Sequence, residues 1–235
     1  MDVLVAPLST LVSTVIGEVL ELDPATIRVV RADSLMALPS NSPVGSRMAI
    51  MLGGAAAGAA RRIREALIEI AAHNLGCTVE AVEYAEGDVA VRGQPEKRLA
   101  WDDLVTIAHR KHHRMPPGVE PGLQAKFVWE VPTGGAMPTP EGTVQMYPCY
   151  AFEAHVVYVE IDPDTAQPRL RQYVCGHDCG VMINPDIVHG MTYGGIAHGI
   201  GAALYEKFAY TEDGQLASGT FMDYLIPTAM EIPPI

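Results

Sequence analysis

The segment from Cys175 to Gly201, CGHDCGVMINPDIVHGMTYGGIAHGIG, constrains the fold of this chain more than any other. It has the pattern of a strand end, a loop with Asn-Pro, and a helix rich in small residues. Each glycine inside a helix costs about 1 kcal/mol relative to alanine. Such a cost is usual where another backbone or a ligand approaches closely, so this helix is a candidate functional segment. Its last twelve residues hold five glycines, Gly190, Gly194, Gly195, Gly199 and Gly201.

The composition narrows the class of protein. With 235 residues, of which 49% are hydrophobic and 19% charged, the chain has enough apolar material for a globular core. A formal net charge of −12 disfavours nucleic acid and anionic membrane surfaces as partners. The four cysteines are too few for a disulfide framework, and no apolar run reaches the roughly 20 residues of a membrane span. The N-terminus lacks the cationic region of a signal peptide, so we expect a cytoplasmic protein.

Helical and strand-like patterns alternate along the chain, and a segment rich in Pro and Gly interrupts them. Helices are predicted at residues 8–22, 49–75, from 100 onward and 184–207, and strands at 26–32, on both sides of 86–88, and at 155–161, 168–174 and 208–211. We therefore predict an α+β fold with a first lobe at residues 1–114, a connector at 115–148 and a second lobe at 149–235. A long irregular connector inside a compact domain is often functional.

Several clusters of reactive residues were considered as sites, and for each a structural interpretation is favoured. Residues 175–179 hold two thiols and an imidazole, but a structural zinc site takes four ligands, usually from two separated pairs, so a buried strand end is favoured. The basic residues at 109–114 are interpreted as a solvated helix end, where cations suit the helix dipole, rather than as a phosphate site. A hydrolase triad has no GxSxG segment to support it. The segments GGAAAG and GGIAHGIG lack the Lys of a P-loop and the spacing of GxGxxG.

Three segments together resemble the large, molybdopterin-binding subunit of the xanthine dehydrogenase, aldehyde oxidase and carbon monoxide dehydrogenase family. They are NSPVGSRMAIMLGGAAAGAARRIREALIEIAAHNLG, EAHVVYVEIDPDTAQPRLRQYVCGHDCG, and the stretch from INPDIVHGMTYGGIAHGIGAALYE to DYLIPTAMEIPPI. The resemblance runs in order from about residue 8 to the last residue. The final element is the most specific, because it combines Asn-Pro, a Gly-rich helix, a strand, an Asp-Gly turn and IPPI.

This resemblance implies two lobes of a molybdenum-cofactor-binding domain, in a hydroxylase that oxidises a small organic substrate or carbon monoxide. The implied cofactor is molybdenum–molybdopterin, with its cytosine dinucleotide form as an option, and iron–sulfur clusters and FAD on partner domains or subunits carry the electrons away. By position, the resemblance assigns two sets of residues to the cofactor. They are Gly45, Ser46, Arg47, Met48 and Ala49 in the loop 41–50, and Gly190, Met191, Thr192, Gly194 and Gly195 in a second turn. No residue is assigned as a ligand to a metal.

Independent physical reasons support the first set. A loop of Pro, Ser and Gly that enters a helix N-terminus is suited to an anion, and the small residues that follow would let the cofactor approach the backbone. We expect Arg47 at the edge of a cavity that the amides of residues 46–49 share with residues 190–192. We also expect Gly194, Gly195 and Gly199 to face inward, toward this loop or the cofactor.

The chain departs from the family pattern in three places. Met191 stands where the family commonly has a Gln, and a thioether cannot donate an amide hydrogen bond. The GQG-type loop of the family would precede Met1, and its catalytic Glu, in a GxGE setting, would follow Ile235. We therefore expect an incomplete chain without a catalytic residue. Such a chain should expose apolar surface. We expect it to work as an oligomer with the remaining parts of the molybdenum subunit and with iron–sulfur and flavin subunits.

Two alternatives belong to other classes of protein. In the first, the chain is a non-catalytic scaffold or assembly subunit that keeps the fold without binding the cofactor. Met191 is the sequence signal for this alternative. A weaker alternative is a small α+β module that binds another ligand.

Overall fold

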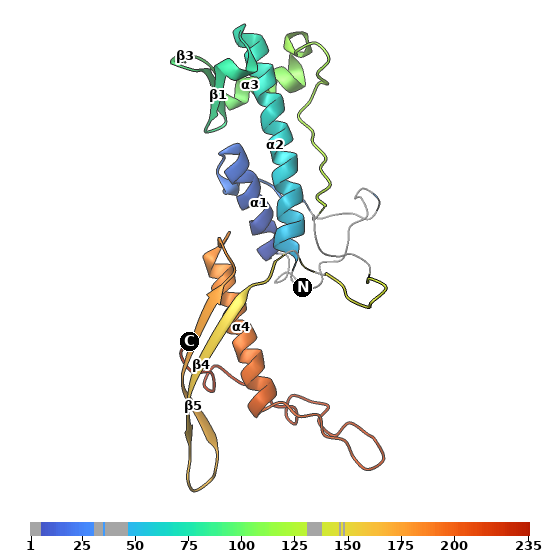
Figure 1. Ribbon diagram of the computed structural model, residues 1–235, viewed down its shortest axis with the longest axis vertical. Helices are drawn as coiled ribbons and strands as arrows, with labels where there is room; N and C mark the ends of the chain where they lie inside the picture. Colours follow the sequence, from blue (N-terminus) through green and yellow to red (C-terminus); the bar gives the residue numbers. More distant parts are fainter. Residues whose placement is uncertain (1–5, 31–34, 36–46, 131–137, 146, 148) are drawn as a thin grey trace. The chain divides into compact units, whose positions relative to one another are not determined.

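The computed structural model describes residues 6–30, 35, 47–130, 138–145, 147 and 149–235 (Figure 1). Contacts divide the chain into two compact units, Met1–Pro148 and Cys149–Ile235. Both units combine helices with antiparallel strands, which confirms the predicted α+β class. In this division the connector at residues 115–148 belongs with the first unit.

Three helices build most of the first unit. They are α1 (Ala6–Leu20), α2 (Met48–Leu75) and α3 (Trp101–Arg110), accompanied by the 3-10 turns Pro24–Thr26, Val79–Ala81 and His112–Arg114. The longest, α2, ends at Gly76, which has a left-handed φ of 68° and donates its N–H to the carbonyls of Ala72 and His73. Glycine adopts this conformation without steric cost, so the helix ends where the sequence predicted, at residue 75.

A small sheet and the second half of α2 enclose the core of the first unit. The antiparallel strands β1 (Val82–Ala85), β2 (Asp88–Val91) and β3 (Gln94–Leu99) lie in the order β1-β2-β3. The predicted hairpin at residues 86–88 joins the first two, whereas β3 was not predicted, because its sequence QPEKRL is largely polar and exposed. The fully buried large side chains are Leu67 and Ile70 of α2, Val89 of β2, and Leu104 and Ile107 of α3.

Two strand predictions are wrong. The segment predicted as a strand at 26–32 begins instead with the 3-10 turn Pro24–Thr26, where the Asp23 carboxylate accepts a hydrogen bond from the Ala25 N–H at 2.9 Å. Residues 27–30 follow without regular structure. The strand predicted at 208–211 is reduced to a single bridge between Tyr210 and Leu216. A strand needs a partner along its length; the first segment finds none among the described residues, and the second finds only this bridge.

The second unit consists of a long hairpin, one helix and an irregular C-terminal segment. Strands β4 (Phe152–Ile161) and β5 (Pro168–Asp178) pair antiparallel, with a bulge between Tyr158 and Val159. Helix α4 (Pro185–Leu204) starts at Asn184, whose side chain accepts from the Ile187 N–H at 3.1 Å. After α4 the chain folds back locally, where the buried Ser218 hydroxyl accepts from the Ala209 N–H at 2.9 Å.

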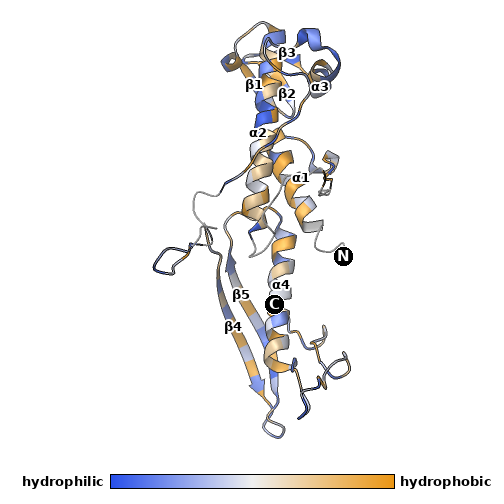
Figure 2. Cartoon of the chain, turned by 90° about the vertical axis from the view of Figure 1, so that its right-hand side faces the viewer, coloured by the Kyte–Doolittle hydropathy of each residue, from blue (hydrophilic) through white to orange (hydrophobic). Residues whose placement is uncertain are grey.

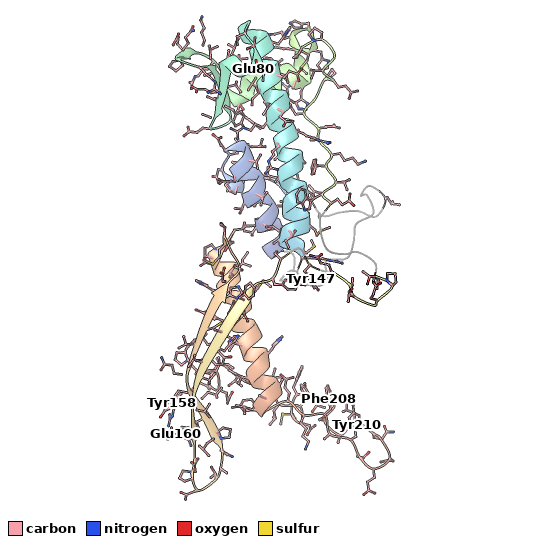
Figure 3. All side chains as sticks on the ribbon, in the orientation of Figure 1. Glu80, Tyr147, Tyr158, Glu160, Phe208 and Tyr210 are labelled. Atoms are coloured by element: carbon pink, nitrogen blue, oxygen red, sulfur yellow. The ribbon has the colours of Figure 1, made fainter. Side chains whose placement is uncertain are left out.

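The hairpin leaves much apolar surface exposed. All ten residues of β4 are exposed, and Figure 2 shows hydrophobic and hydrophilic residues alternating along both strands. Tyr158 and Glu160, labelled in Figure 3, lie in the half of β4 that leads to the turn, while Phe208 and Tyr210 lie after α4. Exposed side chains on the strands include Phe152, Val156, Tyr158, Ile161 and Val174. Exposed apolar patches of this kind mark interaction surfaces.

Candidate functional site

The first turn of α2 leaves its backbone amides without a side-chain cap. Arg47 is the N-cap residue and makes no capping hydrogen bond, and its carbonyl accepts from the Met51 N–H at 3.0 Å. The first N–H groups of a helix have no acceptor within it and carry the positive end of its dipole. This position is therefore suited to an anion. Of the predicted cofactor residues, Arg47, Met48 and Ala49 lie here, while Gly45 and Ser46 lie outside the described residues.

Two buried donors in the first unit have no acceptor among the described residues. Across the part of the chain that the structure describes, the buried side-chain nitrogen or oxygen atoms without a hydrogen-bond partner are Nε of Arg47 and Nε1 of Trp129. Leaving a buried donor unpaired costs about 1–3 kcal/mol. Both N–H groups therefore favour an acceptor that the described residues do not supply.

Aromatic rings of the connector occupy the glycine side of α2. A Cβ atom added to Gly54 would lie 2.6 Å from the ring of Trp129, and one added to Gly58 would lie closer still to the ring of Phe127. The guanidinium of Arg62 lies 5.0 Å from the centre of the Phe127 ring, a cation–π distance. The expectation that these small residues leave room for the cofactor is therefore wrong at Gly54 and Gly58, because the chain fills that room with its own side chains.

The second set of predicted residues lies in the middle of a helix. Gly190, Met191, Thr192, Gly194 and Gly195 all belong to α4, which corrects the interpretation of this segment as a turn. A Cβ added at Gly190, Gly194, Gly195 or Gly199 would meet no atom within 4 Å, and Met191 is 68% exposed. Within residues 149–235 nothing packs against these glycines, so their orientation toward the loop or the cofactor stays a prediction. The helix presents an open, nearly side-chain-free surface.

A groove lies between α4 and the hairpin. Its volume is about 670 Å³, and its walls are mainly apolar, with Val157, Val159 and Leu170 from the strands and Ile196, Ile200, Ala203 and Leu204 from the helix. Met191, Thr192 and Gly195 of the predicted set line it as well. An apolar groove with a few polar groups at one end is typical of a ligand site.

Glu153, His155 and Tyr173 at the polar end of this groove belong to a hydrogen-bonded network that the sequence did not predict. The Glu153 carboxylate is 2.6 Å from Nδ1 of His177 through one oxygen and 3.2 Å from Nε2 of His155 through the other. The Tyr173 hydroxyl is 3.1 Å from Nδ1 of His155. The hydrogen bond from His177, followed by that from His155, lowers the pKa of the Glu153 carboxyl. The carboxylate thereby fixes the orientation of both imidazoles.

The register of the hairpin creates this network. Glu153 and His155 are two residues apart on β4, so they share a face, and His177 of β5 pairs directly with Glu153. The alternation of EAHVVYVE gave the first relation, whereas the second required the pairing of the two strands. A further pocket of about 490 Å³ is lined by His177 and Tyr173 together with His189 and Tyr193 of α4. The rings of His189 and Tyr193 stack with their centres 6.2 Å apart.

The described residues form no cluster of three or more His, Cys, Asp or Glu side chains that could hold a metal ion. Among the same residues, no helix combines the length and apolar character needed to cross a bilayer.

Comparisons with known proteins agree with this architecture. The family model described as "Molybdopterin cofactor-binding domain" matches residues 8–233. The chain is 31% identical to the nicotine 6-hydroxylase large subunit of Paenarthrobacter nicotinovorans, over 96% of this chain and 26% of that one. It is 30% identical to the carbon monoxide dehydrogenase large chain of Hydrogenophaga pseudoflava, over 95% of this chain and 26% of that one.

The fold is also similar to a solved structure. The Cu,Mo-CO dehydrogenase superimposes with a TM-score of 0.82 at 29% sequence identity, over 96% of this chain and 26% of that chain. The chain thus spans about a quarter of the length of each of these relatives.

Proposed function

Because the chain belongs to the family of molybdopterin cofactor-binding domains, we propose that it holds the molybdenum cofactor of a hydroxylase. In this proposal the enzyme oxidises or hydroxylates a small organic substrate, or carbon monoxide. Further polypeptide, equivalent to the remaining three quarters of the relatives, completes the molybdenum subunit. Iron–sulfur and flavin partners accept the electrons.

The observation that carries the proposal is the unpaired donor set at the start of α2. The Arg47 side chain makes no cap for the first-turn amides, and its buried Nε–H has no acceptor among the described residues. Both donors suit the anionic phosphate or pyrophosphate of a pterin cofactor, in a chain whose net charge is −12. The residues present therefore fit the group that the family binds.

The glycine surface of α4 supplies the second contact. Gly190, Gly194 and Gly195 present backbone without Cβ atoms, and nothing within residues 149–235 lies close to them. A flat group can therefore approach the helix axis more closely than any side chain would permit. Met191 adds a polarisable apolar contact in place of a hydrogen bond. When bound, the molybdenum centre supplies the oxidation chemistry, while these residues bind and orient it.

The test measures the cofactor directly. The chain is produced together with the polypeptides of its complex, and molybdenum and pterin are quantified in the purified complex. We expect Arg47→Gln and Gly45→Val to lower both contents several-fold, because the first removes a charge-assisted donor and the second blocks backbone approach. Arg61→Gln, at an exposed position of the same helix, is the matched control and should leave both unchanged.

The outcome also decides between the two function classes. A wild-type complex without molybdenum and pterin would overturn cofactor binding and favour a non-catalytic scaffold, for which Met191 is the sequence signal. A loaded wild-type complex whose Gly45→Val variant keeps its molybdenum would show that the loop before α2 does not hold the cofactor.

A further inference from the structure

One segment of the connector runs along the first half of α2 and is attached to it at three points. We call residues 123–130 the strap. The Trp129 ring lies over Gly54, the Phe127 ring lies over Gly58, and the Lys126 carbonyl accepts a hydrogen bond from the Arg62 guanidinium at 2.6 Å. Residue numbers decrease along α2 as they increase along the strap, so Trp129 is the contact nearest to Arg47.

The contacts over the glycines depend on shape. At Gly54 an added Cβ would fall 2.6 Å from Cγ and Cδ2 of Trp129, at the base of the ring, so the ring must shift away from the helix. The indole N–H has no acceptor among the described residues, so packing holds the ring without a hydrogen bond. Aromatic rings in such positions bury large apolar areas.

Helix α2 needs this support at one end. Its second half is fixed by the core of the first unit, at Leu67 and Ile70. Its first half, MAIMLGGAAAG, includes three glycines, and each glycine inside a helix weakens it relative to alanine. The strap contacts the helix at two of these three, Gly54 and Gly58, and therefore stabilises this half together with α1, which also packs against α2.

We propose that Trp129 and Phe127 are positioning residues, which hold the first turns of α2 and thereby Arg47 in the geometry that binds the anionic end of the cofactor. This inference rests on the proposed function, because it assigns to the strap the ordering of the same site. The rings contact the helix and act on the cofactor only through it.

The experiment has one readout for the strap and another for the cofactor. Trypsin must reach the Lys126 carbonyl to cut after Lys126, and that carbonyl is bonded to Arg62 while the strap is docked. In the assembled complex, Gly54→Ala should increase the rate of this cleavage about tenfold and lower molybdenum content several-fold. Gly53→Ala is the matched control, since a Cβ at Gly53 meets nothing within 4 Å, and it should change neither quantity.

A second pair of variants covers the case in which Gly54→Ala does not fold. Trp129→Ala empties the space without overpacking and should raise cleavage and lower molybdenum content. Trp129→Phe keeps a ring and should keep both the cleavage rate and the molybdenum content close to the wild-type values. Since Gly54→Ala and Trp129→Ala remove the same contact, the double variant should be no worse than the more severe single one.

Three results would overturn the proposal: unchanged cleavage in Gly54→Ala and Trp129→Ala, increased cleavage with full molybdenum content, or the same losses in Gly53→Ala. A wild-type complex without molybdenum is a distinct outcome. It overturns the proposed function, and with it the positioning role, while the cleavage rates still report whether the strap docks.

Discussion

Tyr84 connects the end of α1 to the body of the first unit. Its hydroxyl donates a hydrogen bond to the Leu20 carbonyl at 2.7 Å, and the Arg64 guanidinium lies 4.3 Å from the centre of its ring. Arg64 also forms an ion pair with Glu21 at 2.9 Å. Burial is the main cause that raises the pKa of Tyr84 to about 12. The phenol is therefore neutral in the folded protein under all ordinary conditions.

Replacement of Tyr84 by Phe should lower the free energy of unfolding by about 1 kcal/mol, because the Leu20 carbonyl loses its donor while the ring contacts remain. Urea unfolding at pH 7 measures this. Tyr158→Phe, at an exposed position, should change stability by less than about 0.5 kcal/mol. A cost for Tyr158→Phe equal to that for Tyr84→Phe would contradict the role given to the buried hydroxyl.

The same residue predicts a dependence on alkaline pH. The folded pKa is raised above the unfolded value near 10, so the unfolded chain releases the Tyr84 proton first. The stabilising contribution is complete below pH 10 and is lost as the pH rises toward 12. The difference in stability between wild type and Tyr84→Phe should therefore shrink over this range. A constant difference would contradict the raised pKa.

At the level of elements, the features that could be predicted are those whose cause is local. Gly76 follows an amphipathic repeat, so the end of α2 could be predicted. Arg47 was assigned by the family resemblance, and a polar loop before a helix start agrees with that assignment. The strand at residues 26–32 was wrong, because its apolar residues have no partner strand among the described residues. The His177–Glu153 contact and the strap both depend on segments that meet only in the folded chain.

Gly76→Ala should destabilise the first unit by about 1 kcal/mol, since alanine at a φ of 68° is strained. Gly76→Asn should cost less, because Asn tolerates the left-handed conformation better. Gly53→Ala places the same methyl group in helical backbone and should change stability in the opposite direction, by up to about 1 kcal/mol. Thermal unfolding of the three variants checks the order, and an unchanged midpoint for Gly76→Ala would contradict it.

The hairpin network predicts an effect at acid pH. The lowered pKa of Glu153 means that its contribution to the order of the hairpin is present above the ordinary carboxyl pKa and is lost as the pH falls through the lowered value. His177→Asn should raise the pKa of Glu153 more than His155→Asn does, because the bond to His177 is the larger cause. Carbon NMR of labelled Glu153 measures both, and the reverse order would contradict the assignment.

The molecule as a whole exposes apolar surface on the unit that carries α4. Val156 and Tyr158 of β4 are 69% and 66% exposed, and Val174 of β5 is 51% exposed. Both strands lack a further neighbour among the described residues, so their outer edges are free for pairing. Because the chain spans about a quarter of its relatives, further polypeptide is the expected cover for this surface.

The isolated chain should therefore self-associate through the hairpin. Replacing Val156, Tyr158 and Val174 by Ser should shift sedimentation toward the monomer, because it removes apolar area next to free strand edges. Val79→Ser, at an exposed apolar position of the other unit, is the control and should have no effect. A wild-type chain that sediments as a monomer would contradict this prediction.

The strap also has a consequence for the order of folding. Phe127 lies about 70 residues after Gly58, so the contact between them closes a long loop, and long loops close late. Until then, the glycine-rich start of α2 has little intrinsic tendency to remain helical. On a ribosome, the contacts of the strap with this end of the helix must wait for the synthesis of Trp129. We expect cofactor insertion to come later still, so that a nascent chain cannot capture the cofactor before the strap has emerged.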